Sequence, residues 1–447
     1  MFAADPASHP ERRPQAGYRT WVPYAVPALG STAPAFLVQF YFLAFATDVL
    51  LIAPATVGAI LAAGRIWDAV TDPLAGYASD RTRSRWGRRR PWLAVAGPAS
   101  ALAFLALWSP PAALQSSGAL AAWSAVALFL FTAATTGWAI PHQAWGVELS
   151  DDADARTRIF GARFAVSLWG AALSFGGMQI VANAADPRRA AGELAWIVAL
   201  VMVALLCLPV WALRERPEFQ GRPMANPLRA TGDVLANPLA RRLLAIWFIT
   251  QLGMSSQGVI APYMSTYVLK RPDLMGVMPA IFIAPLILSV PLWIHLARRF
   301  GRKRVWLASM LGASVSYAGL FLPLHDDFGL TAALLACSGF FTGCGGPVGP
   351  TFFADVVDDD ARRTGERREG VYFAAKEFVE KASGATVALA VGLALQAAGF
   401  VPNVEQGESA RLAIRACLGL LPGATLLLGA LLLRGLAADD DEVASAP

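Results

Sequence analysis

Long apolar segments recur along the whole chain and are separated by short polar connections. The longest segments run to about 20 residues or more, enough to cross the hydrocarbon core of a bilayer as a helix. Lipid offers no partners to backbone polar groups, so such segments predict an all-α polytopic membrane protein. Twelve spans are predicted, at 21–47, 54–79, 91–110, 118–147, 160–184, 193–213, 241–269, 274–298, 303–323, 329–356, 370–398 and 410–435.

The composition agrees with this class of protein. Only 15% of the 447 residues are charged, whereas a soluble protein carries about a quarter. Residues 1–20 are polar and lack the apolar core of a cleavable signal peptide, so we expect the first span to direct insertion. The surrounding lipid bilayer is therefore a predicted partner, and nothing in the composition indicates binding of nucleic acid.

Basic residues gather in alternate connections between the spans. They occur at 81–90, 156–158, 214–229, 298–304 and 362–368, whereas residues 48–53, 111–117 and 324–328 contain none. Loops rich in Lys and Arg stay in the cytoplasm. Both termini are therefore predicted to be cytoplasmic, in a multi-pass protein of a bacterial inner membrane.

Two loop patterns repeat at nearly the same offset. Trp86-Gly-Arg-Arg resembles Phe300-Gly-Arg-Lys, and Glu148-Leu-Ser-Asp-Asp resembles Asp355-Val-Val-Asp-Asp. Duplicated patterns indicate a repeat, and parallel six-helix repeats with a substrate site between them are the major facilitator layout. The predicted parts are a tail at 1–20, bundles at 21–213 and 241–435, a cytoplasmic linker at 214–240 and a tail at 436–447. Residues near these loops are predicted to take part in gating, namely Arg65, Asp80, Arg81, Gly87, Arg88, Glu148, Asp355 and Arg362.

The second span carries two carboxylates inside an apolar segment. Asp68 and Asp72 are four residues apart and share one face of a helix. Bare carboxylates at that distance repel by roughly 3 kcal/mol even at an effective dielectric constant near 20, so the pair requires a proton, a metal cation or a basic group. Thr71 adds a hydroxyl oxygen, and hard cations such as sodium take oxygen ligands. A cation site is predicted here; the alternative is that both aspartates only cap or pair helices.

The eleventh span carries Lys381, a compact charge in a chain that otherwise prefers arginine. We predict a coupling role for Lys381; the alternative is a lysine whose ammonium extends to the interface. Arg163, in the fifth span, faces the central cavity or anchors the interface. His142 and Gln143 follow the expected kink at Pro141, and Trp145 is among the tryptophans suited to stacking on a sugar ring or lining the path of an amphiphile.

No nucleotide-binding loop, metal-ligand cluster or nucleophile elbow is visible in the sequence. The chain is therefore predicted not to be an enzyme and to need no cofactor beyond a coupling ion. Uphill transport would then draw on a sodium or proton gradient. A membrane sensor that binds a ligand without transport is a second alternative.

The segment Arg65-Ile-Trp-Asp-Ala-Val-Thr-Asp-Pro, followed by Asp80-Arg-Thr-Arg-Ser-Arg-Trp-Gly-Arg-Arg-Arg-Pro, resembles the signature of the glycoside-pentoside-hexuronide:cation symporters. That family includes the melibiose permease. Further matches are Ile140-Pro-His, Glu148-Leu-Ser-Asp-Asp, Asp355-Val-Val-Asp and Lys381. The resemblance implies a major facilitator fold and cation-coupled uptake of a sugar or glycoside by alternating access, by a protein expected to act as a monomer.

The resemblance also assigns roles to individual positions. Asp68 and Asp72 match cation-binding aspartates, Lys381 matches a coupling lysine, and Arg163 matches an arginine near the sugar. This chain differs from the melibiose permease at three positions. Thr32 and Ala139 stand where that protein has acidic residues that bind the sugar, and Gln143 stands where it has an aromatic residue that stacks on the sugar. Vertebrate lysolipid symporters of the same wider family share the Asp-Ala-x-Thr-Asp-Pro pattern, so a lysophospholipid or other amphiphile is the alternative substrate.

Overall fold

A computed structural model of the protein describes residues 18–150, 152–215, 234, 237–322, 328–364 and 369–435. These residues are almost entirely helical, and no strand occurs among them. Most of the predicted tail at 1–20, the predicted tail at 436–447 and most of the predicted linker at 214–240 lie outside the described residues, and residues 18–20 begin the first helix.

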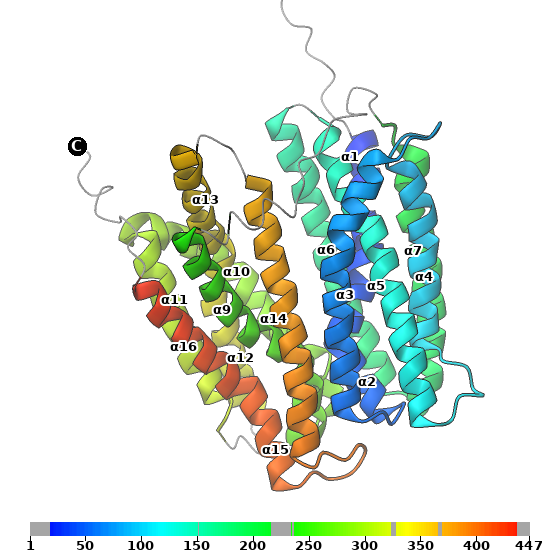
Figure 1. The fold of residues 1–447 in the computed structure, drawn as a ribbon. Coiled ribbons are helices and arrows are strands. Elements are labelled where there is room, and N and C mark those ends of the chain that lie inside the picture. The colour runs from blue at the N-terminus through cyan, green and yellow to red at the C-terminus, as the bar shows by residue number, and fades with distance from the viewer. Residues whose placement is uncertain are drawn as a thin grey trace, which may run out of the picture.

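The described helices form two bundles that stand side by side (Figure 1). The first bundle contains α1 (Tyr18–Ala25), α2 (Pro27–Asp48), α3 (Pro54–Arg81), α4 (Arg90–Trp108), α5 (Ser117–Glu148), α6 (Ala153–Ala182) and α7 (Pro187–Ala212). The second contains α9 (Pro238–Tyr263), η2 (Met264–Val268), η3 (Pro272–Leu274), α10 (Val277–Phe300), α11 (Arg302–Gly319), α12 (Phe328–Thr342), α13 (Gly345–Thr364), α14 (Glu369–Ala397), α15 (Glu408–Arg415), η4 (Ala416–Leu420) and α16 (Leu421–Arg434).

Several neighbouring helices continue one another as a single rod. When α1 with α2, α9 with η2, α12 with α13, and α15 with η4 and α16 are each counted once, the described residues form twelve rods, six in each bundle. Ten of these are apolar enough to be recognised as membrane spans by composition. The other two are α3, which carries the intramembrane charges, and α11, which begins with Arg302-Lys303-Arg304.

Local chemistry explains where the helices depart from the predicted ranges. The sixth span was predicted from residue 193, but α7 begins at Pro187 because the Asp186 side chain accepts a hydrogen bond from the Arg189 backbone N–H and caps the helix. The predicted tenth span is broken between α12 and α13, where Gly343 falls in a glycine-rich run. Such breaks are tolerated in membranes where neighbouring helices shield the backbone.

The two bundles meet at the end of the molecule where α2 ends and α3 begins. There the Asn403 side chain donates to the Asp48 carbonyl at 2.7 Å, and the Gly276 N–H donates to Gln179 at 2.8 Å. Helices α3 and α14 approach most closely at Gly58 and Gly392, where an added Cβ would lie 2.5 Å and 2.4 Å from backbone oxygens of the opposite helix. Toward the opposite end, where α1 and α13 are labelled, the bundles diverge (Figure 1).

Candidate functional site

A cluster of charged side chains lies at the contact between α3 and α14. The Lys381 ammonium of α14 contacts both carboxylates of α3, with 2.8 Å to Asp68 Oδ2 and a short contact to Asp72 Oδ2. The three side chains are between 16% and 26% exposed. The structure therefore brings Asp68, Asp72 and Lys381 together, and their opposite charges join the two bundles.

A threonine on a third helix completes this cluster. The Thr136 hydroxyl of α5 lies 2.7 Å from Asp68 Oδ1 and 3.0 Å from Asp72 Oδ1. Sequence reasoning missed Thr136, because threonine is common in apolar helices, where its hydroxyl bonds to the preceding turn. In the sequence, Thr136 is marked only by its place in the fourth span, which also holds Pro141. Its contact with α3 depends on how the two helices pack.

The other polar residues of α3 take different positions. The Thr71 hydroxyl donates to the Asp68 carbonyl at 3.2 Å, within its own helix, so Thr136 is the hydroxyl that contacts both carboxylates. The Arg65 side chain reaches α14, where its Nε would lie 3.8 Å from a Cβ added to Gly384. Cation binding by Thr71 and gating by Arg65 stay predictions.

Four charged side chains meet at this site. The Lys381 ammonium pairs with both carboxylates, and the Arg65 guanidinium interacts electrostatically with Asp68, so the formal charges sum to zero. The pair Asp68 and Asp72 keeps its oxygen atoms together on one helix face, with the Thr136 hydroxyl beside them. This arrangement supplies several oxygen atoms at one point, which are the ligands that a hard cation takes, and either carboxylate can instead accept a proton.

The predicted substrate residues of the first bundle lie mostly in packed surroundings. His142 is fully buried, with its ring stacked between Tyr24 at 4.4 Å and Trp138 at 4.3 Å between centroids, and Trp145 is 1% exposed. Neither side chain therefore reaches open space in this conformation. Their predicted roles in substrate binding remain untested.

Three further predicted substrate residues are less enclosed. Thr32 lies at the contact of α2 with α6, where a Cβ on Gly170 would come within 3.0 Å of it. Gln143 is exposed and Arg163 is partly buried. Substrate contact at these three positions stays a prediction.

The loop between α3 and α4 folds back into a buried ion-pair cluster. Glu148, at the end of α5, accepts from Arg88 at 2.6 Å and from Arg89 at 3.1 Å, and Arg89 also pairs with Asp80 at 2.5 Å. Arg88 and Arg89 are less than 10% exposed. The cluster therefore links the ends of α3, α4 and α5. Asp80, Arg88 and Glu148 are among the residues predicted to take part in gating, whereas Arg89 is not, and the gating role stays a prediction.

A glycine makes this loop possible. Gly87 has φ +104°, a conformation that suits glycine, and an added Cβ would lie 2.5–2.6 Å from the Glu215 carboxylate. Glu215 accepts hydrogen bonds from the backbone N–H groups of Arg88, Arg89 and Arg90 at 2.7–2.8 Å. This carboxylate caps the start of α4 and favours it electrostatically. Sequence reasoning did not single out Glu215.

The second bundle repeats the pairing in a more open form. Gly301 has φ +88°, and the adjacent Arg302 pairs with Asp355 at 2.9 Å, as Arg88 pairs with Glu148. The side chains of Arg302 and Asp355 are 42% and 53% exposed, whereas those of Arg88 and Glu148 are about one tenth exposed. Two further residues are among those predicted to take part in gating. Arg362 is exposed on α13, and the Arg81 guanidinium lies over the Tyr77 ring of its own helix, 4.3 Å from the ring centroid.

This asymmetry predicts unequal effects of two matched substitutions. Glu148→Gln should lower the stability of the purified protein by about 3 kcal/mol, because it leaves buried arginines without full compensation. Asp355→Asn should change it by less than about 1 kcal/mol, since exposed pairs contribute little. Thermal unfolding in detergent measures both, and equal shifts for the two variants would contradict this interpretation.

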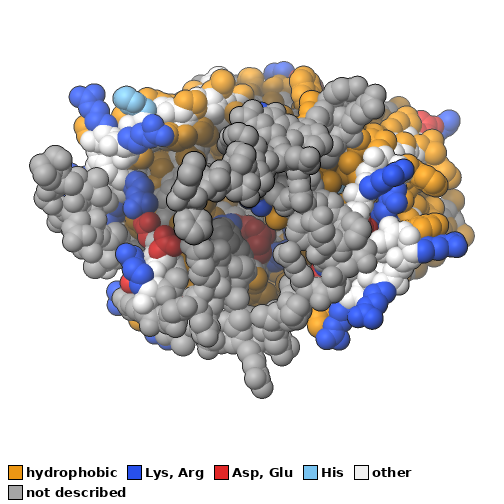
Figure 2. Space-filling model, turned by 90° about the horizontal axis from the view of Figure 1, so that it is seen from above, with side chains coloured by type: hydrophobic (Ala, Val, Ile, Leu, Met, Phe, Trp, Pro, Cys, Tyr) orange, Lys and Arg blue, Asp and Glu red, His pale blue; other side chains and the backbone are white. Residues whose placement is uncertain are grey.

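The face that bears these loops is rich in basic side chains. Seen from that end, Lys and Arg side chains lie around the rim, and acidic side chains are visible nearer the middle (Figure 2). The distribution is the one that the positive-inside rule associates with the cytoplasmic side.

The two six-helix bundles and the ion pairs of Lys381 with Asp68 and Asp72 are together typical of a multi-pass membrane transporter. The chain belongs to the MFS/sugar transport protein family, whose model matches residues 23–438. A D-xylose-proton symporter of known structure superposes with a TM-score of 0.69 over 94% of this chain and 98% of that chain, at 14% identity. This confirms the predicted major facilitator fold, and family membership makes the protein a transporter rather than an enzyme.

Two relatives extend over nearly the same length. An uncharacterized symporter from Synechocystis is 25% identical over 93% of both chains. A sodium-dependent lysophosphatidylcholine symporter from Danio rerio is 24% identical over 90% of this chain and 81% of its own. The similarity therefore covers the whole membrane region.

Proposed function

We propose that the protein is a cation-coupled symporter of the glycoside-pentoside-hexuronide type, acting in a bacterial inner membrane with both termini cytoplasmic. The observation that carries the proposal is the contact of Lys381 with Asp68 and Asp72. Intramembrane ionisable groups are costly and usually functional, and this ion pair connects the two bundles that alternating access moves. We propose the monomer as the transport unit, since both bundles that carry the ion pair belong to one chain.

The mechanism follows from competition for two carboxylates. A sodium ion or a proton binds at Asp68 and Asp72, with Thr136 contributing its hydroxyl oxygen to sodium. The cation replaces the Lys381 ammonium as the neutralising charge, so the ion pair between the bundles is released. The bundles then rearrange around the bound substrate. A carrier without its cation keeps the ion pair and does not complete the cycle, because unpaired buried charge is unfavourable.

We propose a sugar or glycoside as the substrate. The family description supports this choice, as it names sugar transport. The alternative substrate is a lysophospholipid or another amphiphile, supported by the relative that is a sodium-dependent lysophosphatidylcholine symporter. Both candidates use the same proposed cation site, so the ion chemistry does not separate them.

Reconstituted vesicles test this function directly. Purified protein in proteoliposomes should accumulate a labelled substrate only when a sodium or proton gradient is imposed. Separate gradients identify the ion, and labelled glycosides and lysophosphatidylcholine identify the cargo. Binding of either cargo with no uptake under any gradient would instead support the sensor alternative.

A further inference from the structure

A further carboxylate stands one helical turn from Lys381, nearer the start of α14. Glu377 is four residues before Lys381, so the two side chains are neighbours on one face of the helix. Glu377 interacts electrostatically with Lys381 and with Asp72, and its side chain is 62% exposed. Its carboxylate also lies 4.0 Å from the Lys376 ammonium. Glu377 is therefore only loosely paired, although it stands beside the charged residues that join α3 to α14.

A second carboxylate on this part of α14 is already held by close partners. Glu380 accepts a hydrogen bond from the Trp247 indole N–H of α9 at 2.7 Å, and it forms a short ion pair with Lys376. The Lys376 ammonium also lies over the Trp247 ring, 4.5 Å from the ring centroid. Lys376 and Glu380 therefore neutralise each other against α9, and the surplus negative charge remains at Glu377.

The formal charges of this charged set leave one negative charge over. The set contains four carboxylates and three basic side chains, which are Asp68, Asp72, Glu377, Glu380, Arg65, Lys376 and Lys381. One monovalent cation, either sodium or a proton, therefore neutralises it. If that cation binds between Asp68 and Asp72, the Lys381 ammonium needs a new carboxylate.

We propose that Glu377 receives the Lys381 ammonium when a cation occupies Asp68 and Asp72; this rests on the proposed symport. Lys381 is 16% exposed, and an ammonium released there without a new partner would be strongly unfavourable. A Glu four residues before a Lys is the favourable orientation of such a pair on a helix. The exchange needs only rotation about the bonds of the lysine side chain, since its four-carbon stem is flexible.

The exchange moves an ion pair from between the bundles to within one helix. In the structure, Lys381 of α14 holds Asp68 and Asp72 of α3. After the exchange, both Lys381 and Glu377 belong to α14, so the bundles lose this connection and no ammonium is left unpaired. Glu377 is a positioning residue, because it acts through Lys381 and does not contact the cation or the substrate.

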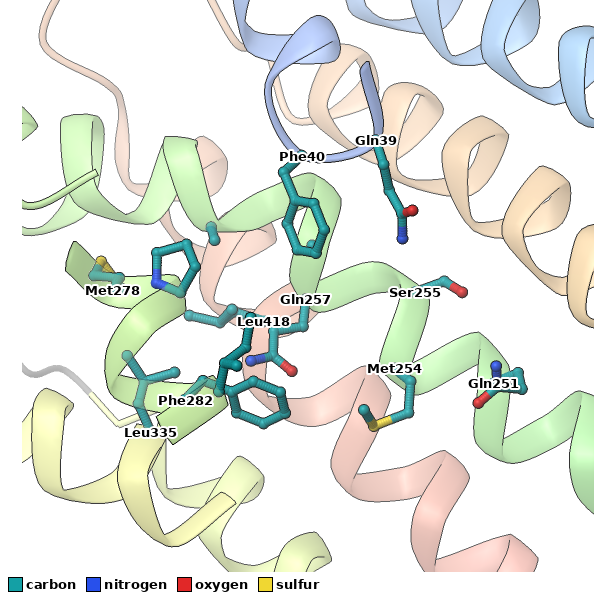
Figure 3. A pocket seen from close by; sticks show the side chains of 14 residues that line it. Gln39, Phe40, Gln251, Met254, Ser255, Gln257, Met278, Phe282, Leu335 and Leu418 are labelled. Carbon is teal, nitrogen blue, oxygen red and sulfur yellow. The ribbon is translucent and has the colours of Figure 1, made fainter. Parts of the chain in front are cut away.

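The cavity between the two bundles offers no comparable acceptor. It has a volume of about 240 Å³ and is lined by α2 of the first bundle and by α9, α10, α12 and η4 of the second. No Asp or Glu is among its lining residues, and its polar side chains are Gln39, Gln251, Ser255 and Gln257 (Figure 3). An ammonium directed there would meet neutral groups, whereas Glu377 provides a charged partner, and charge-assisted hydrogen bonds are the stronger ones.

Cation titrations of Glu377 variants test the proposal. The full-length protein in detergent is titrated with sodium chloride at constant ionic strength and, separately, with acid, and the shift in Tm is measured. Glu377→Gln should need about tenfold more of the coupling cation, a value between those of an exposed i,i+4 pair and a buried charge contact. Glu377→Asp keeps the carboxylate and should restore most of the affinity. Glu408→Gln, an exposed carboxylate at the start of α15, is the matched control.

A double-substitution cycle separates this exchange from the simple loss of a nearby negative charge. In a Lys381→Gln background there is no ammonium to receive, so Glu377→Gln should change the cation requirement by less than about twofold. An equally large effect in both backgrounds would overturn the proposal, because Glu377 would then act on the cation itself. An unchanged cation requirement in Glu377→Gln would also overturn it, while gradient-driven uptake still stands. Absence of both cation-induced shifts in Tm and gradient-driven uptake would refute the symport, and the proposal with it.

Discussion

Asp72→Asn is expected to abolish cation-driven accumulation of substrate. In the amide variant Lys381 pairs with Asp68 alone, and the cation loses one of the two carboxylates that are proposed to bind it. Removing one charge contact at about 4 Å corresponds to roughly 4 kcal/mol at an effective dielectric constant of 20, or about a thousandfold in cation affinity. Initial rates of uptake into proteoliposomes, under a gradient of the coupling ion, measure the loss.

A matched substitution and a second assay make this result specific. Glu193→Gln removes a carboxylate from an exposed i,i+4 pair with Arg189 and should transport normally. Folding of Asp72→Asn is checked by the Tm of the detergent-solubilised protein. If Asp72→Asn still concentrates substrate at the normal rate, the cation does not bind where we propose.

Gly392→Val is expected to stop transport by a steric route that leaves the cation site intact. An added Cβ at this position would lie 2.4 Å from the Pro54 carbonyl oxygen and 3.1 Å from the Gly58 Cα, distances that backbone atoms cannot accommodate without moving. The ends of α3 and α14 should therefore separate and the closed end of the molecule should open. Uptake should fall at least about tenfold, whereas the cation-induced shift in Tm should persist.

Distance measurements identify the cause of that loss. Spin labels at Ala53 and Val401, which are exposed near the closed end, should move apart in Gly392→Val, in a background without the native cysteines. Gly176→Ala is the control, because a Cβ at Gly176 meets nothing within 4 Å. An unchanged label separation in Gly392→Val would show that these helices accommodate the side chain and that closure is not controlled here.

The local pattern of the chain predicted much of this architecture. Segments of apolar residues long enough to cross a bilayer predicted the helices, because backbone groups in lipid have no other partners. The repeated Gly-Arg loops predicted related surroundings for Gly87 and Gly301, and both adopt positive φ. Asp68 and Asp72 drew attention because charge inside an apolar segment is costly wherever the chain folds. These are consequences of composition and spacing along one helix.

Contacts between helices were decided by the tertiary structure alone. Nothing in the spacing of the sequence connects Thr136 with Asp68, or Glu215 with the start of α4, since each pair depends on how separate helices pack. The same holds for the cavity between the two bundles. Gln39 of α2 and Gln257 of α9 both line it, although nothing in the sequence connects these two positions. A single helix determines which side chains share its face, but only the packed bundle determines what that face meets.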